Sequence, residues 1–128
     1  MSPGTRFAVA ARIVPRKGIH IYAPGAEGYR IVSLRIDPQP FVRLLPMQFP
    51  PSEIYHFEPL DEHVPVYQTP FTLLQEVVLE VTGEAERALR TSKTLTLTGT
   101  LEYQACDDKI CFNPVSMPLS WTLALVAH

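Results

Sequence analysis

Two cysteines are the residues of this chain whose type and spacing could do chemistry. Cys106 and Cys111 are its only cysteines, and four residues separate them. Two thiols this close can cycle between a dithiol and a disulfide, because disulfides form and break by thiolate attack through a mixed disulfide. An inert disulfide and a pair of free thiols are the alternatives that the spacing leaves open.

The segments on either side of the cysteines predict a β-hairpin. Residues 95–103 and 117–125 alternate between apolar and polar side chains, a pattern typical of half-buried strands. Residues 107–110 then form a four-residue loop, which is usually built on a type I turn that favours Asp. Cys106 and Cys111 face each other at the first rung, where opposed Cα atoms lie about 4.5–5.5 Å apart. A disulfide can span that distance.

A disulfide in this position would stabilise the fold only weakly. The chain-entropy model gives about 2 kcal/mol or less for so short a loop. A cross-strand bond at a hairpin end can also be strained, and strained or exposed disulfides are the more easily reduced. Redox activity and an inert disulfide are equally compatible with these arguments. A zinc site is less favoured, because two thiolates need two further ligands and the histidines show no paired spacing. These histidines are His20, His56, His63 and His128.

The cysteine hairpin is one of three segments with a recognisable pattern. It reads Tyr-Gln-Ala-Cys, four residues, Cys, two residues and Pro, after a strand rich in Thr and Leu. Residues 17–24 read Lys-Gly-Ile-His-Ile-Tyr-Ala-Pro, and Val66-Tyr67 leads into Phe71-Thr-Leu. These three segments, in their order along the chain, resemble the N-terminal periplasmic domain of the thiol:disulfide interchange protein DsbD. The resemblance covers about residues 7–123. The insert between the cysteines is shorter than in that family.

The resemblance implies an immunoglobulin-like β-sandwich and a role as an electron courier. Such a domain takes electrons from a thioredoxin-like protein or domain and passes them to extracytoplasmic disulfide proteins. Cys106 and Cys111 would be the redox pair, with Cys111 forming the mixed disulfide and Cys106 resolving it. The implied location is the bacterial periplasm or another extracytoplasmic compartment, and no cofactor or metal is expected. The alternative function is a non-catalytic immunoglobulin-like interaction module with a structural disulfide.

Several neighbours are candidates for shaping the site. The resemblance places His20 and Tyr22 near the cysteines, and the family has aromatic residues at both positions. His20 could therefore tune proton transfer, since histidine titrates near neutrality, or it could be a surface residue with no role. Asp107 and Asp108 should disfavour the thiolate of Cys106, unless they form only a solvated turn. Lys109 partly offsets their charge.

The family also shields its disulfide with a mobile cap loop that bears an aromatic residue. Counting back from Tyr67 places the counterpart near Leu60, with Phe57 as the nearby alternative. Both lie within residues 46–65, a proline-rich stretch without periodicity that we expect to be a functional loop or a crossover packed by its own aromatics. Two further candidates are Tyr67 itself and Tyr103, which lies at the end of the strand before the cysteines.

The rest of the chain predicts about seven or eight strands and no helix, which is typical of a β-sandwich. Further strands are expected at residues 7–14, 19–22, 29–36, 41–45 and 71–81, and a solvated loop at 83–93. We expect a single domain over residues 1–128, excised from a longer chain, with no signal peptide visible. The net charge of −2 without a basic run argues against nucleic acid. No apolar run approaches the roughly 18 residues of a membrane span, so membrane association is expected only through a parent chain.

Overall fold

The computed structural model describes residues 6–80, 82–84, 87 and 94–124. These residues form β1 (Arg6–Ile13), β2 (His20–Tyr22), β3 (Ser33–Ile36), β4 (Val42–Gln48), β5 (Glu53–Phe57), η1 (Glu58–Leu60, a 3₁₀ turn), β6 (Glu62–Tyr67), β7 (Phe71–Leu79), β8 (Thr94–Tyr103), β9 (Ala105–Cys106) and β10 (Val115–Ala124). Within the described ranges, no helix has the length and apolar character needed to cross a lipid bilayer.

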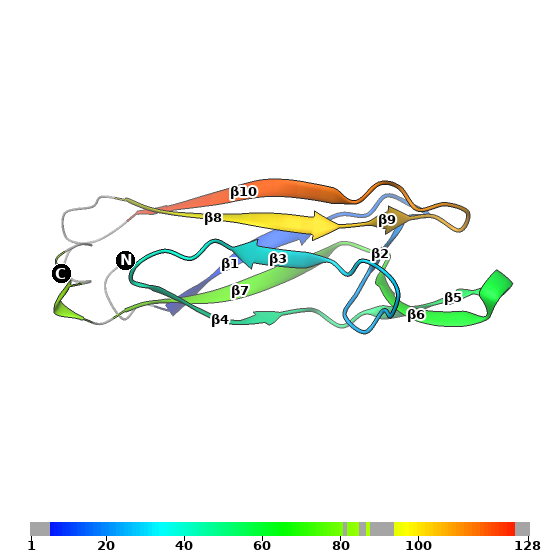
Figure 1. Ribbon diagram of the computed structural model, residues 1–128, viewed down its shortest axis with the longest axis horizontal. Coiled ribbons are helices and arrows are strands. Elements are labelled where there is room, and N and C mark those ends of the chain that lie inside the picture. Colours follow the sequence, from blue (N-terminus) through cyan, green and yellow to red (C-terminus); the bar gives the residue numbers. More distant parts are fainter. Residues whose placement is uncertain (1–5, 81, 85–86, 88–93, 125–128) are drawn as a thin grey trace.

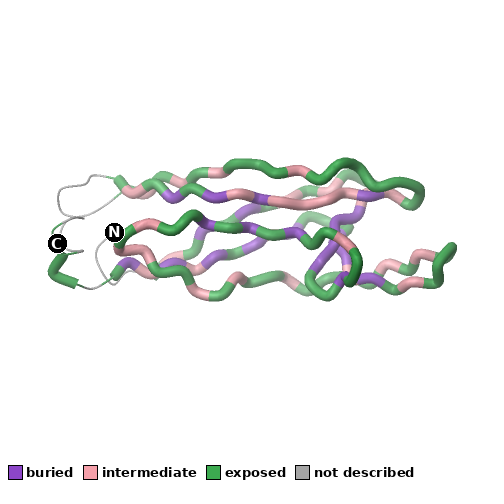
Figure 2. The backbone as a smooth tube through the Cα atoms, in the orientation of Figure 1, coloured by how far each residue is buried: buried purple, intermediate pink, exposed green. Residues whose placement is uncertain are grey.

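Two antiparallel sheets face each other along the long axis of the molecule (Figure 1). One has the strand order β1-β7-β4 and the other the order β10-β8-β3. The period-two pattern explains the packing, since alternate residues of each strand point to the same face. In β7, Leu73, Val77 and Leu79 are fully buried, and Leu73 and Val77 share one core with Leu97 of β8. The buried residues therefore follow the facing sides of the layers (Figure 2), and the predicted all-β sandwich is confirmed.

A third sheet, of order β5-β6-β2-β9, occupies one end of the sandwich (Figure 1). The short β2 is one of its two inner strands, and its Ile21 pairs with Tyr67 of β6 on one side and with Ala105 of β9 on the other. Ile21 packs into the main core, whereas Tyr22 packs into a second apolar cluster. Three residues of β2 thus connect the main core with the cluster beneath the cysteines.

The prediction of a loop over residues 46–65 is wrong. β5 and β6 form an antiparallel hairpin, with η1 at its tip and a register that runs from Glu53 opposite Val66 to Phe57 opposite Glu62. The sequence did not predict these strands because the segment is rich in proline, which usually interrupts strands. Pro46 lies where the pairing of β4 with β7 shifts register, and Pro65 contributes its carbonyl to a hydrogen bond from the Ala23 amide at 3.0 Å.

Other boundaries differ by a few residues from the predicted ones. The strand expected at 29–36 covers only Ser33–Ile36, and the one expected at 41–45 extends to Gln48. The strand expected at 71–81 ends at Leu79, and residue 81 lies outside the described residues. Most of the loop expected at 83–93 also lies outside them.

Candidate functional site

The cysteines lie at the end of a hairpin, as the sequence predicts. β8 and β10 pair up to Tyr103 opposite Val115, and farther out Cys106 and Cys111 form an isolated bridge and a disulfide with a Cα–Cα distance of 4.0 Å. The Asp107 amide donates to the Ile110 carbonyl at 2.9 Å and closes the four-residue turn. The predicted hairpin and the predicted pairing of the two cysteines are therefore confirmed.

The hairpin bends at Gln104, which separates β8 from β9. The Gln104 side chain donates to the Phe112 carbonyl at 3.2 Å, and the Phe112 amide donates to the Ala105 carbonyl at 2.9 Å. These bonds hold the two arms together where the strand pairing of β8 and β10 has ended. Beyond the bend, Cys106 pairs with His20 of β2 and so becomes part of the third sheet.

The two cysteines differ in accessibility. Cys106 is 1% exposed and packs in the second apolar cluster with Tyr22, Val64 and Val66. Cys111 is exposed and lines a cavity of about 120 Å³. Because exchange depends on which sulfur the attacking thiolate can reach, Cys111 is the accessible half of this disulfide.

The cavity lies between the cysteine hairpin and the β5–β6 hairpin, which project from the same end of the molecule (Figure 1). Tyr55 and Phe57 of β5 lie on one wall, and Asp108 and Ile110 lie on the other. The complete lining is His20, Tyr22, Tyr29, Tyr55, Phe57, Val64, Asp107, Asp108, Lys109, Ile110 and Cys111. The cavity is therefore rich in aromatic rings and opens beside one sulfur.

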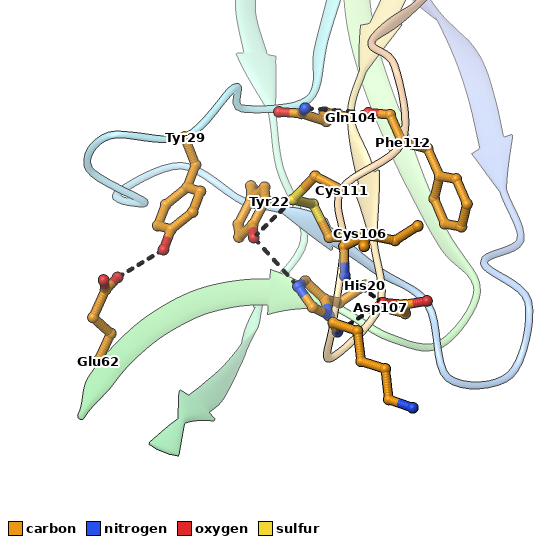
Figure 3. Close-up of a disulfide and its surroundings, with 11 residues drawn as sticks. His20, Tyr22, Tyr29, Glu62, Gln104, Cys106, Asp107, Cys111 and Phe112 are labelled. Carbon is orange, nitrogen blue, oxygen red and sulfur yellow. Dashed lines mark hydrogen bonds between the residues drawn. A yellow bond between two sulfur atoms is a disulfide. The ribbon is translucent and has the colours of Figure 1, made fainter. Parts of the chain in front are cut away.

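The Tyr22 hydroxyl contacts both the disulfide and His20 (Figure 3). Its hydroxyl oxygen is 3.9 Å from Cys111 Sγ and 3.4 Å from His20 Nε2. Its ring stacks on Tyr29 at 4.2 Å between centroids, and the Tyr29 hydroxyl donates to Glu62 at 2.8 Å. Burial, together with the neighbouring tyrosines and Glu62, raises the pKa of Tyr22 to about 12. Tyr22 therefore keeps its proton at neutral pH and can donate a hydrogen bond to a sulfur anion.

His20 is 3% exposed, so the alternative of a surface histidine is wrong. Its ring stacks on Tyr55 at 4.3 Å and meets Tyr22 edge-on at 5.3 Å. Burial lowers the pKa of His20, and the negative charges of Asp107 and Asp108 oppose this shift. The ring is thus held largely neutral near the disulfide, since desolvation penalises its charged form.

Asp107 has a structural task in the turn. Its Oδ1 accepts hydrogen bonds from the amides of Lys109 and Ile110, each at 2.7 Å. These two bonds lower the pKa of the Asp107 carboxyl, because they stabilise the carboxylate. Asp108 is exposed and lines the cavity. The acidic pair therefore places negative charge at the rim of the cavity and also shapes the loop.

Three predicted candidates do not line the cavity. Leu60, in η1, is 63% exposed. Tyr67 is buried in the main core, where it stacks on Phe71 at 4.0 Å and donates to the Pro50 carbonyl at 2.8 Å. Tyr103 packs against the same main core. Of the two residues considered for the cap, the structure thus places Phe57 rather than Leu60 at the cavity.

The sequence reasoning missed Tyr29 and Tyr55 as parts of the site. Tyr55 shares a face of β5 with Phe57, and this alternation was the available signal. Tyr29 had no local signal, because it lies outside any strand and reaches the cavity through the turn that follows β2. Its place depends on stacking against Tyr22, a contact that only the folded chain creates.

Comparison with known proteins identifies the family. The family model described as "Thiol:disulfide interchange protein DsbD, N-terminal" matches residues 1–118. The chain belongs to the DsbD N-terminal domain family. Among solved structures, it is similar to the reduced DsbD N-terminal domain of Neisseria meningitidis, with a TM-score of 0.57 and 16% identity over 96% of this chain and 84% of that chain. A search of curated proteins gave no match.

Membership of the DsbD N-terminal family and this structural likeness confirm the immunoglobulin-like β-sandwich predicted from the sequence. The family and the cysteine pair at disulfide distance also support a general role in thiol–disulfide exchange. The family implies an extracytoplasmic location. The disulfide of this DsbD-type domain therefore lies in a setting where exchange with other proteins is its expected chemistry.

Proposed function

We propose that this domain relays electrons by dithiol–disulfide exchange between a thioredoxin-like donor and disulfide proteins of the bacterial periplasm. The observation that carries this proposal is the asymmetry of the disulfide, with Cys106 buried and Cys111 exposed beside a cavity. A purely structural bond would need no accessible sulfur. An exchange site needs one sulfur within reach of a partner and a second that is protected until the first has reacted.

In the reducing half of the cycle, a thiolate of the donor attacks Cys111 Sγ. The Cys106–Cys111 bond breaks, Cys106 leaves as a thiolate, and a mixed disulfide joins the donor to Cys111. The second thiol of the donor then attacks the donor's own sulfur in that mixed disulfide, which releases the Cys111 thiolate. The donor ends as a disulfide, and this domain has gained two electrons and, after protonation, two protons.

In the delivering half, the Cys111 thiolate attacks a disulfide of the target protein. One target sulfur leaves as a thiolate, and the other forms a mixed disulfide with Cys111. Cys106 then attacks Cys111 Sγ, restores the internal disulfide and releases the second target thiolate. The target leaves reduced by two electrons. Cys106 can perform this step from a buried position because its partner sulfur belongs to the same hairpin.

The residues of the cavity serve this cycle in different ways. Tyr22 donates to the Cys111 thiolate, since its hydroxyl already lies 3.9 Å from that sulfur and keeps its proton at neutral pH. Hydrogen bonds to a charged group are stronger than neutral ones. Asp107 and Asp108 place negative charge near Cys106 and raise the cost of its thiolate. Cys111 is thereby the better attacking sulfur of the pair.

The β5–β6 hairpin acts as the cap over this site. Phe57 and Tyr55 line the same cavity as Cys111, so a partner must move this hairpin aside or dock against it to reach the sulfur. The tip of the hairpin makes few buried apolar contacts, because η1 contains no buried residue. Segments with little buried surface open at low cost in free energy.

Cysteine variants test the assignment of roles. Cys106→Ala and Cys111→Ala are each mixed with an oxidised thioredoxin-like protein, and mixed disulfides are separated on non-reducing gels. Cys106→Ala should accumulate the mixed disulfide because the resolving thiol is absent, whereas Cys111→Ala should form little. Equal amounts from both variants, or accumulation only in Cys111→Ala, would contradict the roles.

Thiol titration of the wild type tests the redox function itself. Mild dithiothreitol should reduce the disulfide reversibly, and the far-ultraviolet circular dichroism should stay that of the folded β-sandwich. Reduction only on unfolding would instead favour a non-catalytic interaction module with a structural disulfide.

A further inference from the structure

The β5–β6 hairpin brings together three potential metal ligands that are not part of the disulfide site. His56 and His63 are directly opposite each other in the register of the two strands, and Asp61 lies in the turn between them. Their ligand atoms all lie within 4.8 Å of one another, and all three residues are exposed. The spacing of the histidines in the sequence gives no sign of this arrangement, which the register of β5 and β6 creates for His56 and His63.

The contacts within the group hold the three side chains close together. The imidazole rings of His56 and His63 are parallel within 6°, with centroids 4.3 Å apart. Asp61 Oδ1 lies 2.9 Å from His56 Nε2. A hydrogen bond explains only the contact between His56 and Asp61. A metal ion would bind His63 as well.

We propose that His56, Asp61 and His63 form a binding site for a divalent transition metal ion of the Zn²⁺ type. Imidazole nitrogens and a carboxylate oxygen are ligands that suit Zn²⁺ and its neighbours. Ligand atoms about 2.0–2.1 Å from a tetrahedral Zn²⁺ lie about 3.3 Å from one another. The ligand atoms lie within 4.8 Å of one another, so they must approach by up to about 1.5 Å. The two parallel rings must also tilt so that their lone pairs converge. Exposed side chains can make both changes by rotation about their χ angles.

The site would leave one coordination position open. Three protein ligands plus water is the arrangement of zinc sites that exchange a ligand, whereas structural sites usually have four protein ligands. The tip of the hairpin projects from the end of the molecule (Figure 1), so this position faces solvent. The ion would tie both strands and the turn together at one point.

The proposed site lies on the opposite face of the hairpin from the disulfide cavity. Successive residues of a strand point to opposite faces, and Tyr55 and Phe57 line the cavity while His56 lies between them in sequence. Metal binding therefore does not require the cysteines. It can be measured with the disulfide intact, and its outcome is independent of the proposed exchange function.

Calorimetric titration of the oxidised, untagged protein with ZnCl₂ tests the site. We expect saturable binding of one ion per chain. His56→Gln and His63→Gln should each weaken binding by about tenfold or more, and Asp61→Asn, which preserves the shape of the side chain, should weaken it less. His128→Gln is the matched control, since it removes a histidine that is not among the three ligands, and it should bind like the wild type.

A second measurement separates lost binding from a damaged fold. Zn²⁺ should raise the thermal midpoint of the wild type relative to the protein in chelator, because a ligand that binds only the folded state stabilises it. The His63→Gln variant should unfold at a normal midpoint in chelator and show a much smaller rise with the same Zn²⁺ concentration. The proposal fails if Zn²⁺ does not bind, if both histidine variants bind like the wild type, or if His128→Gln abolishes binding.

Discussion

His20 lies directly opposite Cys106 on neighbouring strands, with its ring buried against Tyr55. This pairing places a titratable ring beside the protected half of the disulfide. Burial lowers the pKa of His20 below its ordinary value of 6.5. The folded protein therefore keeps the ring neutral at pH values where the unfolded chain already binds a proton.

The first prediction concerns the pH dependence of stability. As the pH falls below 6.5, the unfolded state takes up the His20 proton before the folded state does, so the free energy of unfolding decreases until the folded pKa is passed. His20→Phe keeps an aromatic ring against Tyr55 and removes this loss. Urea midpoints at about pH 7.5 and about pH 5 should fall more in the wild type than in the variant.

Asp107 does not confuse this measurement. The pKa of Asp107 in the folded state is lowered from 3.8. The stability linked to this carboxylate is therefore lost only as the pH falls below about 3.8. Equal pH slopes for wild type and His20→Phe would show that the burial of His20 does not contribute to the pH dependence of stability.

The second prediction concerns Tyr22 in the reduced protein. Tyr22→Phe keeps the ring that stacks on Tyr29 but removes the hydroxyl next to Cys111 Sγ. Loss of a hydrogen bond to an anionic sulfur should slow alkylation of Cys111 by iodoacetamide at neutral pH about fivefold to tenfold. Tyr29→Phe is the control, because it removes the bond to Glu62 and leaves Tyr22 in place. Similar rates in both variants would argue against a role for the Tyr22 hydroxyl.

The third prediction compares Phe57 with Leu60. Phe57 lines the cavity beside Cys111, whereas Leu60 is 63% exposed and does not. Phe57→Ala should speed reduction of the disulfide by a small thiol severalfold, since access to the sulfur controls the rate. Leu60→Ala should leave the rate unchanged. If Leu60→Ala accelerates reduction and Phe57→Ala does not, the shielding side chain has been misassigned.

The fourth prediction concerns the pairing of β3 with β8, in which Ile36 lies opposite Gly99. A Cβ atom at Gly99 would lie 2.6 Å from the carbonyl oxygen of Arg35, and a backbone atom cannot move aside as a flexible side chain can. Gly99→Ala should lower the free energy of unfolding by about 1–3 kcal/mol in urea titrations. Gly83→Ala is the matched control, since the nearest atom to its new Cβ is the end of the Arg87 side chain at 3.6 Å. That variant should change stability by less than about 0.5 kcal/mol.

Local patterns in the sequence were sufficient for the cysteine hairpin and for the strands of the core. The alternation before and after the cysteines predicts β8 and β10, and the four residues between Cys106 and Cys111 predict the turn that joins the sulfurs. The alternation from Phe71 to Leu79 likewise predicts the buried face of β7. Such features depend on residues close in sequence, so their spacing alone carries the information.

Tertiary contacts decided the surroundings of the disulfide. β2 becomes an inner strand of the third sheet because it pairs with both β6 and β9, which are distant in sequence. That pairing buries His20, which looks like a surface residue when only its neighbours are considered. The β5–β6 hairpin could not be predicted from the sequence because its prolines are untypical of strands. The register of its two strands brings His56 opposite His63. The residues themselves predict the reacting sulfurs, whereas strand pairing between distant segments determines which sulfur is exposed and what surrounds it.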